Sequence, residues 1–163
     1  MVGMASPEAC GSLAHELVHL LIRPSLPLSP PWLEEGLASE VAVALPQGSR
    51  FHFAKSWRDR TLRDNWSLRP SVGTLLDLSW SDFRAASAAD LRRAAAVQAM
   101  AAAFIRYLDA KGELIVVYSE MRDHLFNADR SAIQTSQQIV QRALGGIDVN
   151  AIDADFDHWF NST

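Results

Sequence analysis

Apolar and polar positions over the first part of the chain follow a helical period. Ser6 followed by Pro7 is typical of a helix start, so we expect a helix over Pro7–Ile22. On a helical wheel, His15 and His19 fall on one side and five apolar residues on roughly the opposite side. These five are Cys10, Leu13, Leu17, Leu20 and Leu21. The pattern predicts that the leucine stripe is buried and that the histidine face is free for another use.

Prolines separate this helix from the next one. Residues 23–31 hold four of the seven prolines and predict an extended connection. A second helix is expected from residue 31 to about residue 45, where Pro46 ends it. Residues 47–89 show a mixed pattern and predict an irregular connection. Within it, "RFHFAKS" is compatible with a short strand, "RPSVGTLLDL" with a turn that enters a short helix, and "SWSDFR" with a capped turn.

The rest of the chain has a strong helical period. We expect an alanine-rich helix over 89–110 that Gly112 closes, followed by helices over about 113–126, 131–144 and 148–160. Gly145 and Gly146 close the third of these four helices. This half of the chain, residues 90–163, is interpreted as a helical scaffold.

Length and composition indicate one ordinary folded domain. The chain has 163 residues, 48% of them apolar and 21% charged, which is enough for one hydrophobic core. A net charge of -4 gives no basic field for nucleic acid, so we expect no nucleic-acid partner. We recognise no signal peptide and no apolar run long enough to span a membrane, and we expect a soluble protein whose compartment stays open. The single cysteine cannot form an internal disulfide.

The segment "HELVH" at residues 15–19 has the spacing of a metal site. Residues four apart on a helix lie one above the other, so the imidazoles of His15 and His19 can bind one ion. Glu16 then stands beside the ion, where it can accept a proton from an activated water. The alternative is that two histidines share a helix by chance. The spacing favours a zinc site with Glu16 as general base.

A catalytic zinc usually has three protein ligands and one open position. Glu35 is the natural third ligand, because the fifteen residues between His19 and Glu35 are enough for the chain to turn back. Its alternative role is a solvated charge at a helix start, and the neighbouring Glu34 could fill either role. Small residues near Glu35 are expected to let the second helix approach the histidine helix closely. They are Gly36, Ala38, Ser39 and Ala42.

With these motifs the sequence resembles the gluzincin metallopeptidases, and more narrowly the peptidase-MA-like group. The resemblance rests on "HELVH" and on "PPWLEEGLASEVA" at residues 30–42. In that family the glutamate directly before the glycine is the third zinc ligand, which implies Glu35 here. Fainter similarities follow in "RPSVGTLLDLSWSDFR", "AAAFIRYLDAKGE" and "DFDHWF". The resemblance implies one zincin-like domain over 1–163, in which 1–46 forms the zinc-binding helices.

The sequence departs from the family pattern in two respects. The first determines the fold that we expect, and the second leaves the oxyanion-stabilising residue unassigned. Gluzincins usually place a twisted sheet before the zinc helix, and fewer than ten residues precede that helix here. We therefore expect a mainly α fold with little or no β-sheet, either as the C-terminal part of an α+β metallopeptidase domain or as a reduced version of one. The tyrosine or histidine that stabilises the oxyanion in relatives is not recognisable near residues 97–98. Possible substitutes are Tyr107, Tyr118, His52 and His124, for each of which packing or surface exposure is the plainer interpretation.

The leading hypothesis is a zinc-dependent metallopeptidase that acts on a peptide or protein substrate, with His15, His19 and Glu35 as ligands and Glu16 as base. The alternative is a catalytically inactive zincin-like module with a structural metal or a role in protein interaction. A third hypothesis is an all-α interaction domain in which the motif arose by chance. For the tryptophans Trp57, Trp66 and Trp80 we expect core positions rather than a substrate groove.

Overall fold

The computed structural model describes residues 7–47, 50–53, 55–127 and 135–163. The described chain is mainly α-helical and contains two strands of three residues each, which confirms the expected fold class. The predicted cap Ser6 and residues 131–134 of the predicted helix over 131–144 lie outside the described residues.

The first part of the chain contains two helices and a small hairpin. Helix α1 spans Pro7–Ile22, as predicted, and α2 spans Pro31–Val41. Helix α2 ends about four residues earlier than expected, because Leu45–Gln47 forms strand β1, which pairs with β2 at Arg50–His52. The pairing is antiparallel and sets Leu45 opposite His52.

The expectation of an irregular connection over 47–89 is wrong, because this segment contains regular helices. They are α3 at Trp57–Asp64, η1 at Trp66–Leu68, α4 at Val72–Asp77 and α5 at Trp80–Ala89. Local caps explain how such short helices form. Ser56 and Asp59 form a reciprocal capping box at α3, and the Ser71 hydroxyl accepts a hydrogen bond from the Thr74 amide at α4. The predicted strand after residue 50 and the predicted short helix after Pro70 are confirmed.

The C-terminal helices confirm the predicted pattern within a few residues. They are α6 at Leu91–Ala110, α7 at Leu114–Asn127, α8 at Ser136–Ala143 and α9 at Val149–Ser162. Asp90 caps α6, and Gly112 follows it with a φ of 79°, a conformation that glycine adopts without strain. Residues 101–108 of α6 are all buried, so this helix is the centre of the core.

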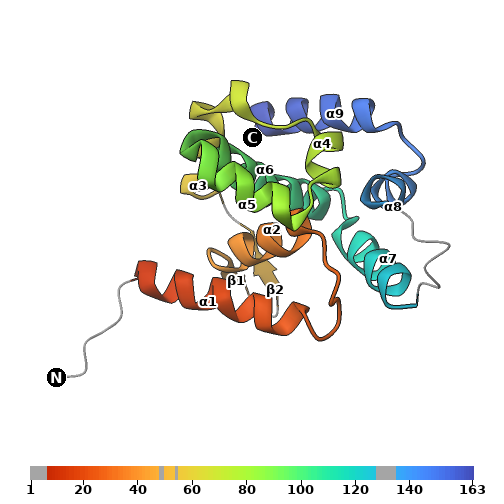
Figure 1. The fold of residues 1–163 in the computed structure, drawn as a ribbon, viewed down its shortest axis with the longest axis horizontal. Coiled ribbons are helices and arrows are strands. Elements are labelled where there is room, and N and C mark those ends of the chain that lie inside the picture. Colours follow the sequence, from red (N-terminus) through yellow and green to blue (C-terminus); the bar gives the residue numbers. More distant parts are fainter. Residues whose placement is uncertain (1–6, 48–49, 54, 128–134) are drawn as a thin grey trace.

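Helix α2 lies between α1 and α6 (Figure 1). A Cβ atom at Gly36 would stand 2.6 Å from Cγ1 of Ile105 and 2.7 Å from the carbonyl oxygen of Ala101, both in α6. The small residues were expected to bring α2 close to the histidine helix. For Gly36 this expectation is wrong, because its missing side chain brings α2 against α6 instead.

The prediction for the buried face of α1 is also wrong. Leu13, Leu17, Leu20 and Leu21 are 51–72% exposed, whereas Val18, His19 and Ile22 are buried. The side chain of Cys10 lies outside the described residues. Helix α1 packs chiefly on α2, and the face it turns inward is the one that carries the histidines. The leucine stripe therefore faces away from the core.

The tryptophans of the middle segment differ in burial. Trp57 is 64% exposed, so the expected core position is wrong for this residue. Trp66 is half-buried and stacks on Phe160 with ring centroids 5.3 Å apart. Trp80 is half-buried too, and its indole N–H donates a hydrogen bond of 3.0 Å to the carbonyl oxygen of Ser29.

Candidate metal centre

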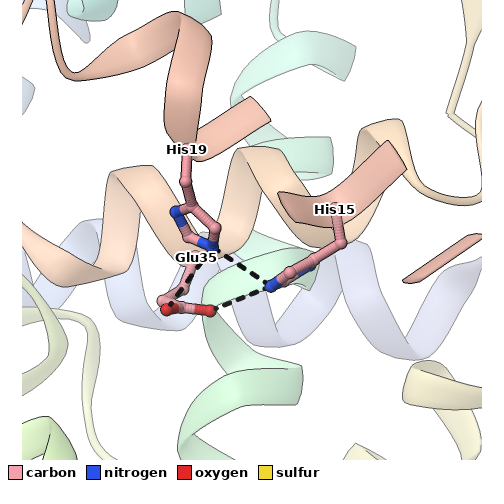
Figure 2. Close-up of side chains that lie close together, drawn as sticks. All are labelled: His15, His19 and Glu35. Atoms are coloured by element: carbon pink, nitrogen blue, oxygen red, sulfur yellow. Dashed lines mark hydrogen bonds and ion pairs between the residues drawn. The ribbon is translucent and has the colours of Figure 1, made fainter. Parts of the chain in front are cut away.

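Three predicted ligands converge between α1 and α2. His15 and His19 point from α1 toward Glu35 on α2, as Figure 2 shows. Nε2 of His15 lies 3.2 Å from Nε2 of His19 and 3.4 Å from Oε2 of Glu35, and Nε2 of His19 lies 3.8 Å from Oε1 of Glu35. One ligand atom from each residue lies within 4.8 Å of the other two.

The two separations that involve Nε2 of His15 are close to the edges of a tetrahedral zinc site. With zinc-to-ligand bonds of about 2.0–2.2 Å, neighbouring ligand atoms of a tetrahedron lie about 3.3–3.6 Å apart. Nε2 of His15 lies 3.2 Å from Nε2 of His19 and 3.4 Å from Oε2 of Glu35, whereas the separation of 3.8 Å from Nε2 of His19 ends on the other carboxylate oxygen, Oε1. Two imidazoles and one carboxylate also form a donor set that zinc binds in catalytic sites. The residues present therefore fit a zinc ion.

Glu34 lies on the opposite side of the His19 ring from the cluster. Its Oε1 is 2.8 Å from Nδ1 of His19, and because a carboxylate accepts hydrogen bonds, Nδ1 is the donor. A neutral imidazole with its hydrogen on Nδ1 has a lone pair on Nε2, the nitrogen that faces His15 and Glu35. Metal-binding histidines commonly have such a carboxylate partner. Glu34 is therefore neither a solvated charge at the helix start nor a member of the cluster, because it is buried and bonded to Nδ1 of His19.

The Glu34 carboxylate is itself held in place by neighbouring residues. It is only 2% exposed, its Oε1 accepts a hydrogen bond of 3.1 Å from Nε of Arg23, and its Oε2 accepts one from the hydroxyl of Ser29. The proline-rich connection between α1 and α2 carries Arg23 and Ser29, so this loop fixes the carboxylate that orients His19. Residue spacing in the sequence did not indicate that Arg23 and Ser29 bind the carboxylate of Glu34.

His15 and Glu35, the other two proposed ligands, are held by different contacts. The rings of His15 and His19 meet edge to face, with centroids 4.9 Å apart and planes at 77°. Nδ1 of His15 is buried and has no hydrogen-bond partner among the described residues. Burial raises the pKa of Glu35, but the hydrogen bond from His15 and the charges of His19, His15 and Arg58 outweigh it and lower the pKa. These interactions favour the ionised form of Glu35.

Solvent reaches the cluster from one side. The side chains of His15 and Glu35 keep 20% and 22% of their surface exposed. Glu16, the predicted base, follows His15 directly on α1 and is exposed. No hydrogen bond or ion pair within the described part of the chain engages its carboxylate, which leaves it available to a substrate or a water.

The four suggested oxyanion residues have other partners or positions. The Tyr107 hydroxyl donates a hydrogen bond of 2.6 Å to Asp155, and Tyr118 shares one of 3.0 Å with Ser25. Nε2 of His124 lies 3.3 Å from Glu120 Oε2, and His52 is exposed at the end of β2. Among the described residues, no interaction joins any of the four to the cluster.

A second group of charged residues lies further along α2. Arg106 of α6 donates hydrogen bonds to both carboxylate oxygens of Asp59, and its Nη1 lies 4.0 Å from Oε1 of Glu40. Glu40 is 1% exposed, and its Oε2 has no hydrogen-bond partner in the described structure. Burial raises the pKa of Glu40 to about 7, against the opposing charge of Arg106. Sequence reasoning did not identify this group.

Comparisons with protein-family models, with curated proteins and with solved structures find no match for this chain. Among the helices that the structure describes, none is both long and apolar enough to cross a membrane. The functional interpretation therefore rests on the residues and their geometry.

Proposed function

We propose that the protein is a zinc-dependent metallopeptidase whose metal ligands are His15, His19 and Glu35. The observation that carries the proposal is the convergence of one ligand atom from each of these residues, all within 4.8 Å of one another, which suits a single ion. The resemblance to the peptidase-MA-like group supports the same ligand set.

Zinc in such a site acts as a Lewis acid that polarises a carbonyl and lowers the pKa of water to about 7. Glu16, an exposed carboxylate adjacent to the ligand His15, accepts the proton of the attacking water and passes it to the leaving amine. Glu34 holds the His19 ring in orientation through Nδ1. The site is accessible on the side of His15 and Glu35, where a peptide can approach.

Metal analysis combined with a peptidase assay tests the proposal. We expect about one zinc per chain, together with cleavage of an unfolded protein such as casein that a chelator abolishes and zinc restores. Glu16→Gln is expected to keep the zinc and to lose hydrolysis, whereas Glu35→Ala loses both. Glu120→Gln, a change at a carboxylate whose ion-pair partners are His124 and Arg142, serves as the control. Hydrolysis by Glu16→Gln at the parent rate would contradict the role of Glu16.

A non-catalytic metal module is the second candidate, and the position of α1 favours it. Helix α1 packs chiefly on α2 and leaves its leucine stripe exposed, so an ion held between the two helices would fasten α1 to the fold. This candidate predicts that zinc binds and raises the melting temperature, while neither the parent nor Glu16→Gln hydrolyses peptides.

A further inference from the structure

Ser29 lies near the end of the connection between α1 and α2, directly before Pro30, the N-cap of α2. Its hydroxyl donates a hydrogen bond to Oε2 of Glu34, and its carbonyl oxygen accepts one of 3.0 Å from the indole N–H of Trp80. Its backbone N–H donates a third hydrogen bond, also of 3.0 Å, to the carbonyl oxygen of Leu26. Ser29 is only 3% exposed, so water competes little for these bonds. Its backbone and its hydroxyl are therefore both held in place.

Trp80 brings a contact from a distant part of the chain to this connection. It is the first residue of α5, and its half-buried ring lies 6.4 Å from the ring of Phe83, which is 5% exposed. Helix α5 packs on α6, the central helix of the core, and α2 packs on α6 as well. The indole N–H of Trp80 thus joins the residue before the N-cap of α2 to a helix that rests on the same part of the core.

Glu34 connects Ser29 with His19. One carboxylate oxygen, Oε2, accepts the hydrogen bond from Ser29, and the other, Oε1, lies 2.8 Å from Nδ1 of His19. A carboxylate is planar, so a bond that fixes Oε2 also fixes the direction in which Oε1 meets the imidazole. Hydrogen bonds to a buried charged group are among the stronger ones in proteins. A continuous series of hydrogen bonds therefore runs from α5 to a proposed metal ligand.

We propose that Ser29 and Trp80 are positioning residues of the metal centre, which raise its zinc affinity by fixing Glu34 and, through Glu34, the ring of His19. The proposal rests on the metal site of the proposed function and not on peptide hydrolysis. Arg23 also bonds to Glu34, but its side chain is 63% exposed, so solvent weakens that contact. The buried series through Ser29 is the stronger of the two supports.

Zinc affinity in variants of the full chain, measured by competition with a chelator, tests the proposal. Ser29→Ala removes the hydroxyl, and Trp80→Phe removes the N–H while it keeps an aromatic ring. We expect each variant to bind zinc about threefold to tenfold more weakly than the parent. In the Ser29→Ala background, Trp80→Phe should add less than about a twofold loss, because the hydroxyl that Trp80 positions is already gone.

Two control variants separate positioning from a general effect. Trp57 is also the first residue of its helix but is 64% exposed, so Trp57→Phe should keep the parent affinity. Tyr118→Phe removes a hydrogen bond of 3.0 Å to Ser25, in the same connection but without a bond to Glu34, and should change the affinity by less than about twofold. Unchanged affinity in folded Ser29→Ala or Trp80→Phe, or an equal loss in Tyr118→Phe, would overturn the proposal.

The ¹⁵N spectrum of the histidine side chains gives a readout that needs no metal. At about pH 8, where an ordinary histidine is neutral, it shows which ring nitrogen of His19 carries the hydrogen. The His19 signal is assigned by its absence in His19→Gln. We expect the hydrogen on Nδ1 in the parent and a larger share on Nε2 in Ser29→Ala and Trp80→Phe.

The two readouts separate this proposal from the proposed function. If the parent binds no zinc but the hydrogen of His19 moves to Nε2 in Ser29→Ala and Trp80→Phe, the metal site fails and the positioning of His19 stands. If the hydrogen stays on Nδ1 in both folded variants, the positioning role is overturned whether or not zinc binds.

Discussion

Nδ1 of His19 donates a hydrogen bond of 2.8 Å to Oε1 of Glu34, which leaves Nε2 of His19 directed at His15 and Glu35. Two adjacent glutamates on α2 thus have different roles. Glu35 lies in the cluster of proposed ligands, and Glu34 holds the ring of His19 in its orientation.

This division predicts different effects for substitutions at the two glutamates. Glu34→Gln removes the charge that orients His19 and should weaken zinc binding by about tenfold to a hundredfold, a typical effect for a residue behind a ligand. Glu35→Gln removes a ligand and should abolish tight binding. Competition with a fluorescent chelator measures both affinities. Equal losses of zinc affinity in Glu34→Gln and Glu35→Gln would show that Glu34 does more than orient His19.

The close contact of α2 with α6 predicts that Gly36 tolerates no side chain. In Gly36→Ala the new Cβ meets the backbone of Ala101 at 2.7 Å, and the helices must separate. We expect a loss of about 1–3 kcal/mol in the free energy of unfolding, measured by urea denaturation. Gly73→Ala is the matched control, because its Cβ comes no closer than 3.4 Å to a neighbour and should change that free energy by less than about 1 kcal/mol. Similar free energies of unfolding for Gly36→Ala and Gly73→Ala would contradict the close contact of α2 with α6.

Glu40 predicts a pH dependence of stability. Burial raises its pKa from 4.5 to about 7, so the folded protein binds a proton more tightly than the unfolded chain does. The stability that this proton contributes is fully present below about pH 4.5, and it is lost as the pH rises through about 7. The pKa difference corresponds to about 3 kcal/mol. Glu40→Gln should therefore gain stability relative to the parent between about pH 5 and pH 8, and urea denaturation at both values checks this. If the free energies of unfolding of the parent and of Glu40→Gln differ by the same amount at both pH values, the pKa of Glu40 is not raised.

The orientation of α1 predicts which of its apolar residues matter for folding. Leu20 is 66% exposed and Ile22 is 6% exposed. Leu20→Gln should change the free energy of unfolding by no more than about 0.5 kcal/mol, whereas Ile22→Ala should cost about 2–5 kcal/mol. Thermal or urea denaturation of both variants distinguishes this orientation from the one that the leucine stripe suggested, in which Leu20→Gln would be the damaging change.

The sequence by itself determined the helices and the candidate metal ligands. Prolines, caps and glycines mark where a helix begins or ends, and these are local effects that act within a few residues. For the same reason the spacing of His15 and His19 on one helix was sufficient to place both imidazoles on one face. The short helix α4 was predicted, but α3 was missed because the capping box of Ser56 and Asp59 stabilises it more than any long apolar period does.

Only the tertiary structure decided which face of α1 is buried, which helix Gly36 contacts and which glutamate orients His19. A helical wheel separates an apolar face from a polar one, but it cannot show that two histidines must turn inward to meet a carboxylate on α2. Asp59, Glu40 and Arg106 come together from three helices that are distant in sequence. Such contacts depend on how the helices pack, and no local pattern of residues encodes that packing.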